Sequence, residues 1–224
     1  MEKIPFSVYD FFAYLFSGAV VLAAIDYIWG IGTLTQKDVS PVLGITLVIF
    51  AYVTGQIVAH ISSALLEHLF VKRILKPPSL LLFGAKPRCV AFKWIFPYYH
   101  RPLPENVMQR IREQASLRNC SAEGEGLFLH VYPIVTANER LQARLDEFRN
   151  QYGFSRNMAF AFFISAAAIC VAHWYGPHPV RIRWAILAAF ASVCLFYRYL
   201  KFFYQYSYEL FIRYSGLPST GTDR

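Results

Sequence analysis

Residues 42–59 read VLGITLVIFAYVTGQIVA, a stretch with no charged side chain and a single amide, Gln56. Three further stretches are similarly apolar: residues 11–25, 158–175 and 184–197. A helix that crosses a bilayer needs ~20 mostly apolar residues, and a water-soluble fold of 224 residues cannot easily bury four such segments. The sequence therefore predicts an integral membrane protein.

The overall composition agrees with this prediction. Hydrophobic residues make up 56% of the chain and charged residues 16%. Soluble domains usually contain about 25% charged residues. Many of the 20 Phe and 15 Tyr lie near the ends of the apolar stretches, where aromatic rings favour the boundary between membrane and water. The four cysteines form no CxxC pair, so we expect reduced cysteines with structural roles only.

The expected fold is an all-α transmembrane bundle of four spans, with a small α+β cytosolic insertion between the second and third spans. A first hairpin occupies residues 1–71, with spans at about 8–29 and 42–66. A basic cytosolic segment covers residues 72–156. The second hairpin, residues 157–215, has spans at about 157–175 and 182–204 and a protruding C-terminal helix. Residues 216–224 are expected to be a disordered tail.

The second span is expected to continue beyond the membrane. No Gly or Pro interrupts the sequence between Gln56 and Lys76, so the helix is expected to reach about residue 74. At ~1.5 Å per residue such a helix is about 50 Å long, which exceeds a hydrocarbon core of ~30 Å.

The insertion has mixed local signals. Residues 80–83 and 89–96 are short apolar runs compatible with strands or buried coil, and residues 127–135 are compatible with a strand. Residues 105–117 are expected to be helical. Thr136-x-x-Glu139 matches a capping box, which predicts a helix from there to about residue 152, before Gly153.

The basic residues predict the orientation. Residues 72–156 contain 14 Lys/Arg and 7 Asp/Glu, whereas the loops on the other side contain only Lys37, Arg181 and Arg183. Positive charge is enriched on the cytoplasmic side of membrane proteins, so we expect both termini and the insertion to be cytoplasmic.

A polar face on the second span is the leading candidate for a functional site. Residues spaced by three or four lie on one face of an α-helix, and polar groups at membrane depth usually face a bundle interior or a water-filled cavity. One interpretation is a pore lining or an inter-subunit seam in a homo-oligomer. The alternative places the inner end of this face at the lipid headgroups. The residues are Gln56, His60, Ser63 and Glu67.

Small residues on the first and third spans predict close helix packing. Ser17, Gly18 and Ala19 lie on the first span, and Ala159, Ala161 and Ser165 lie on the third.

The basic segment has three possible partners: anionic lipid, a soluble protein, and nucleic acid. Nucleic acid is considered because residues 93–101 interleave basic and aromatic side chains. The candidate contact residues are Lys72, Arg73, Lys76, Lys93 and Arg101.

Enzyme motifs are missing from the sequence. There is no GxSxG, Walker A, GxGxxG or HExxH pattern, and His100 and His130 have no carboxylate or Cys at metal-ligand spacing. We therefore expect a protein that is not an enzyme and holds no metal or cofactor.

Residues 8–18, VYDFFAYLFSG, resemble the start of a group of small bacterial membrane proteins. Many of these begin with Tyr-Asp-x-Phe-x-Tyr-Leu-x-Pro-Gly, and Ser17 stands here where that group often has Pro. The layout is similar to that of membrane effectors of bacterial antiviral systems.

This resemblance implies a bacterial inner-membrane protein that alters membrane permeability, as a channel or pore-like effector, under control of its cytosolic segment. Two alternatives stay open. One is a membrane anchor or scaffold that recruits a soluble protein or a nucleic-acid-bound partner. The other is a lipid-modifying enzyme with His60 and Glu67 as its acid–base pair.

Overall fold

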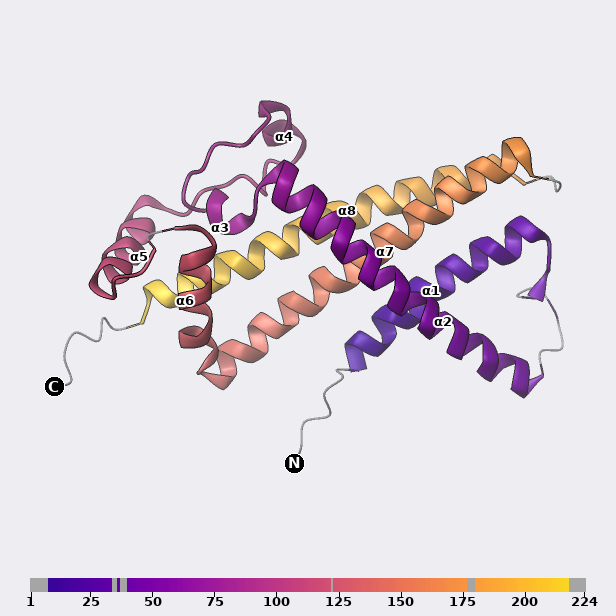
Figure 1. Ribbon diagram of the computed structural model, residues 1–224, viewed down its shortest axis with the longest axis horizontal. Helices are drawn as coiled ribbons and strands as arrows, with labels where there is room; N and C mark the ends of the chain where they lie inside the picture. Colours follow the sequence, from indigo (N-terminus) through magenta and orange to yellow (C-terminus); the bar gives the residue numbers. More distant parts are fainter. Residues whose placement is uncertain (1–7, 34–35, 37–39, 122, 177–179, 218–224) are drawn as a thin grey trace. The chain divides into compact units, whose positions relative to one another are not determined.

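The computed structural model describes residues 8–33, 36, 40–121, 123–176 and 180–217 (Figure 1). The predicted tail lies outside these residues from position 218 onward. Within them the ordered elements are α1 (Val8–Trp29), α2 (Pro41–Ser62), the π-helix η2 (Ser63–Leu75), α3 (Pro78–Leu81), α4 (Val90–Ile95), α5 (Glu105–Leu117), α6 (Gly124–Thr136), α7 (Glu139–Tyr175) and α8 (Ile182–Ser215).

Four of these helical segments are long and apolar enough to cross a membrane: α1, the segment that begins with α2, α7 and α8. By length and composition the chain is therefore a multi-pass membrane protein with four spans, as the sequence predicts. The expected continuation of the second span is also present, since η2 follows α2 directly and reaches Leu75. The 13 residues of η2 adopt the wider winding of a π-helix. This winding is rare and is often found at functional sites.

The α+β character predicted for the insertion is wrong, because the described residues contain no strand. Residues 80 and 81 end α3 and residues 82 and 83 form the turn after it, whereas residues 89–96 fall largely in α4 and residues 127–135 lie within α6. Short apolar runs do not distinguish a strand from a buried helix. The helical periodicity of α6 is nevertheless visible afterwards: Leu127, Val131 and Val135 are spaced by four and all are fully buried.

Two predicted helix boundaries also need correction. The Thr136 hydroxyl donates to the Tyr132 carbonyl inside α6 and caps no following helix. Asn138 takes that role for α7, because its Oδ1 accepts from the Arg140 amide at 3.0 Å. Gly153 does not interrupt the chain, since α7 runs through it to Tyr175. A single Gly in a helix costs only about 1 kcal/mol relative to Ala, which the apolar packing outweighs.

The contacts divide the chain into two compact units. The first unit contains residues 1–68 and 152–199, and the second contains residues 69–151 and 200–224. The C-terminal part of α8 therefore groups with the insertion: Phe83 and Phe128 both pack against Phe211.

In the first unit, α1 and α2 cross at a pair of glycines (Figure 1). A Cβ on Gly18 would lie 2.6 Å from the backbone nitrogen of Gly55, and a Cβ on Gly55 would lie 2.9 Å from the Cα of Tyr14. The two backbones are thus in direct contact, as in other membrane helix pairs that meet through small residues. Ser17 lies beside the crossing, and its hydroxyl bonds the Ala13 carbonyl at 2.9 Å.

The third and fourth spans join this hairpin through small residues. Ala161 of α7 is fully buried and packs with Val58 of α2 and Val20 of α1. Ser192 of α8 donates a 2.8 Å hydrogen bond to the Ala159 carbonyl of α7. Of the predicted small residues, Ser17, Gly18, Ala159, Ala161 and Ser165 are therefore buried within the first unit, whereas Ala19 is exposed.

Candidate functional site

The first unit contains a buried polar network where α2 meets η2. Ser62, the last residue of α2, is fully buried, and its hydroxyl donates to Asn157 Oδ1 of α7 at 2.8 Å. The neighbouring Arg156 donates to the same oxygen from Nε at 3.3 Å and from Nη2 at 3.2 Å. One amide oxygen therefore accepts from two elements and joins them.

Arg156 also forms an ion pair with Glu67 of η2. Its Nη1 lies 2.6 Å from Glu67 Oε2, and the two side chains are 13% and 20% exposed. Charge-assisted bonds of this length are among the stronger ones in proteins, and partial burial reduces screening by water. Tyr199 of α8 is fully buried in the same unit. The ring of Tyr152 lies 6.3 Å from its ring.

The network connects α2 and η2 to α7. Charged groups in a span are expensive and are usually paired toward the bundle interior, where they commonly carry function. The pairing here satisfies the carboxylate and the guanidinium together. Removing either partner would leave the other charge half-buried and unpaired, so the network is either a structural lock or a switch point.

The predicted polar face is divided by the structure. Gln56 and His60 are exposed on the first unit, whereas Ser63 is half-buried and Glu67 points to Arg156. The division follows from the change of winding, because the spacing of an α-helix ends at Ser62. The Gln56 amide donates to the Tyr52 hydroxyl at 2.9 Å, one turn away on the same helix.

The predicted basic contact residues lie in the second unit. Lys72 is 3.9 Å from Glu125, and Arg73 is exposed. Lys76 has a φ of 71° just after η2 ends, and its carbonyl accepts from the Tyr99 hydroxyl at 3.0 Å. Lys93 and Arg101 are exposed. The structure therefore gathers these residues in one unit without bringing all of them to one point.

Ser62, Arg156 and Asn157 were missed as site residues. Arg156 counted only as part of the basic segment, although it stands at the entrance of the third span. The signal that was present is Glu67 itself, since a carboxylate in a span needs a cation at matching depth.

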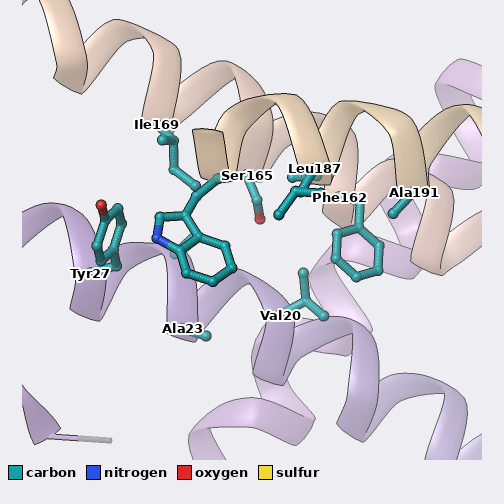
Figure 2. A pocket seen from close by; sticks show the side chains of 11 residues that line it. Val20, Ala23, Tyr27, Phe162, Ser165, Ile169, Leu187 and Ala191 are labelled. Atoms are coloured by element: carbon teal, nitrogen blue, oxygen red, sulfur yellow. The ribbon is translucent and has the colours of Figure 1, made fainter. Parts of the chain in front are cut away.

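An apolar cavity of about 430 Å³ lies between α1, α7 and α8. Figure 2 shows Val20, Ala23 and Tyr27 on one side of it, facing Phe162 and Leu187. Its volume falls within the range of small-molecule pockets, and its lining suits hydrocarbon more than a polar ligand. Among the described residues, no group of His, Cys, Asp and Glu side chains could hold a metal ion.

Comparison of the chain with protein-family models, curated proteins and solved structures gives no match. The functional argument therefore depends on the geometry of the two units.

Proposed function

We propose that this chain is a membrane protein that assembles from several copies and changes membrane permeability under control of its second unit. The location we propose is the bacterial inner membrane, with both termini in the cytoplasm. The resemblance in layout to membrane effectors of antiviral systems supports the same proposal. The path would run along the exposed side of α2.

The exposure of Gln56 and His60 is the observation that carries this proposal. Gln56 lies about 15 residues after Pro41, which places it roughly 22 Å along the helix, inside a hydrocarbon core of ~30 Å. His60 lies one turn further, and both side chains point away from the first unit while Val53 and Ile57 beside them are apolar. Polar side chains facing lipid are costly, and a second copy or a water-filled path would remove that cost.

The polar network supplies the proposed control. Glu67 is held by Arg156, so the inner end of the predicted face is closed in this state. Breaking that pair would free a carboxylate four residues beyond Ser63, next to the segment that leads to the second unit. A partner that binds the second unit would act by shifting this two-state contact.

Flux from liposomes tests the proposal. The full chain is reconstituted with an entrapped ion indicator, and wild type is compared with a Gln56→Leu, His60→Leu double variant. Val53→Leu with Ile57→Leu is the matched control, because these residues are also exposed on the same helix. We expect flux in wild type and control and its loss in the polar double variant, together with a smaller oligomer in detergent. Equal flux in all three, or none in wild type, contradicts the proposal.

The alternative is an anchor that recruits a soluble partner. It requires a second unit that folds around a core of its own, and the fully buried α6 face of Leu127, Val131 and Val135 supplies such a core. An anchor would bind its partner from the membrane without any flux, and the Gln56→Leu, His60→Leu variant would bind equally well.

A further inference from the structure

The second unit presents an exposed surface that is both apolar and basic. We propose that residues 84–104 form an interfacial foot that lies on the anionic headgroups of the membrane. We call this segment the foot below. The inference is independent of the proposed function, because it concerns a different unit and requires neither flux nor oligomers.

The foot exposes large apolar side chains. Helix α4 has no buried residue, although Val90, Phe92, Trp94 and Ile95 make up most of it. Trp94 is 83% exposed, and Tyr98 just after the helix is exposed too. Exposed apolar clusters of this kind mark a binding surface, since soluble surfaces rarely group them.

The opposite side of the foot is firmly attached to the second unit. Tyr99, His100 and Leu103 are buried. The Tyr99 hydroxyl bonds the Lys76 carbonyl at 3.0 Å, and the Leu103 amide bonds the Leu82 carbonyl at 2.9 Å. The Tyr204 hydroxyl bonds the Arg101 carbonyl at 2.9 Å. Residues 99–103 are therefore anchored to the second unit, and α4 with its exposed side chains lies just before this anchor.

Charge decides which surface the foot fits. Residues 84–104 contain four basic residues, Lys86, Arg88, Lys93 and Arg101, and no acidic one. All four are exposed, and the Arg101 guanidinium lies 4.6 Å from the centre of the Tyr98 ring. Aromatic rings beside cations suit the boundary between hydrocarbon and phosphate, where Trp is the preferred anchor.

The covalent structure tethers the second unit to a bilayer. The second unit is joined to the first unit at residues 68–69, 151–152 and 199–200, within segments that belong to candidate spans. A tethered site needs little affinity to be occupied, because its effective concentration at the membrane is high. Each Lys or Arg near an anionic surface contributes about 1 kcal/mol. Nucleic acid would offer phosphates to the basic side chains but no hydrocarbon to the exposed Val90. A lipid surface offers both, so it fits the foot better.

The native Cys89 provides a reporter inside the foot, because it is free and exposed at the start of α4. The full chain carries Cys120→Ser, Cys170→Ala and Cys194→Ala, and a nitroxide is attached to Cys89. Collision with oxygen, which dissolves in lipid, is compared with collision with a water-soluble nickel chelate. The control label is on Leu117→Cys in a chain that also lacks Cys89, because Leu117 is likewise apolar and exposed, on α5.

We expect the Cys89 label to favour oxygen on vesicles that contain phosphatidylglycerol, and to favour nickel on phosphatidylcholine alone. The Leu117→Cys label should favour nickel on both. Trp94→Ala should reverse the preference at Cys89, and Lys93→Gln or Arg101→Gln should each lower the docked-to-undocked ratio about fivefold. A Cys89 label that stays in water on anionic vesicles overturns the proposal. If that label is instead immobilised by an oligouridine in detergent, the foot is a nucleic-acid platform.

Discussion

Gly55 tests the packing of the first hairpin most directly. A Cβ at this position overlaps the Tyr14 carbonyl oxygen and lies 2.9 Å from the Tyr14 Cα. The Cβ would also lie 2.5 Å from the Tyr14 carbonyl carbon. Carbon atoms pack at about 3.5 Å or more, so Gly55→Ala must separate α1 from α2 by about 1.0 Å or more at the crossing. The contacted atoms are all backbone, so no side chain can turn away to relieve the overlap. We therefore expect the cost of overpacking, about 1 to 3 kcal/mol.

Gly44 supplies the control on the same helix. A Cβ there meets nothing within 4 Å. Gly44→Ala should therefore cost nothing and gain up to about 1 kcal/mol of helix propensity. Thermal unfolding in detergent micelles, followed by circular dichroism, measures both. Gly55→Ala should lower the unfolding midpoint by about 2 to 12 °C, and Gly44→Ala should leave it unchanged or raise it.

A second substitution checks that the contact is mutual. Gly18→Ala alone should be as harmful as Gly55→Ala, because its Cβ would lie 2.6 Å from the Gly55 nitrogen. Once the helices have moved apart, the second alanine should cost less than the first, so the double variant should be more stable than additivity predicts. A Gly55→Ala protein as stable as Gly44→Ala would refute the close crossing.

Three further predictions concern other parts of the chain. Arg156→Met leaves Glu67 unpaired, so it should lower the free energy of unfolding by about 3 to 5 kcal/mol. Adding Glu67→Gln should restore most of that loss. Equal stability of the single and double variants in thermal unfolding argues against the pair. Leu127 of α6 is fully buried, whereas Leu129 on the same helix is 66% exposed. Leu127→Ala should cost about 2 to 5 kcal/mol and Leu129→Ala no more than about 0.5 kcal/mol; equal costs would indicate a strand-like face. Burial, and then the charge of Lys93, lowers the pKa of His100, whose ring nitrogens lack hydrogen-bond partners. Below its ordinary pKa of about 6.5, the His100 ring takes up a proton in the unfolded chain but not in the folded chain. The free energy of unfolding should therefore decrease as the pH falls from about 6.5 to the lowered pKa, by at most about 1.4 kcal/mol per pH unit. His100→Phe should flatten this profile between pH values of about 7.5 and 5.5, and an unchanged profile would assign the loss to other groups.

The spans could be predicted because length and composition suffice for them. Residues 42–59 and their three counterparts need no knowledge of partners, since lipid is the solvent on every side. The continuation of the second helix followed from the same kind of local information. Gly55 shows the limit of such local information. Gly44 and Gly55 are both glycines on the same helix, and only the position of Tyr14 makes one of them intolerant of a Cβ.

The insertion could not be predicted as well because its short segments depend on packing. Leu127, Val131 and Val135 carry a helical period, yet the β-branched side chains of this run favoured a strand, and Pro133 argued against the interior of a helix. Asn138 displaced Thr136 as the cap because α6 extends through Thr136 and uses its hydroxyl internally. Arg156 was hidden for a different reason, since its partner Glu67 is 89 positions away in the sequence.

The pairing of Glu67 with Arg156 also bears on the response of the protein to the electric field across a membrane. One negative and one positive group sit within 2.6 Å of each other, and their neighbours Ser62 and Asn157 are neutral. A single charge moved through the field gains or loses about 2.3 kcal/mol per 100 mV, but a neutral pair that moves together gains nothing. A conformational change that keeps the pair intact therefore gains no voltage dependence from these two residues. A change that separates Glu67 from Arg156 does, because each charge then moves alone through the field.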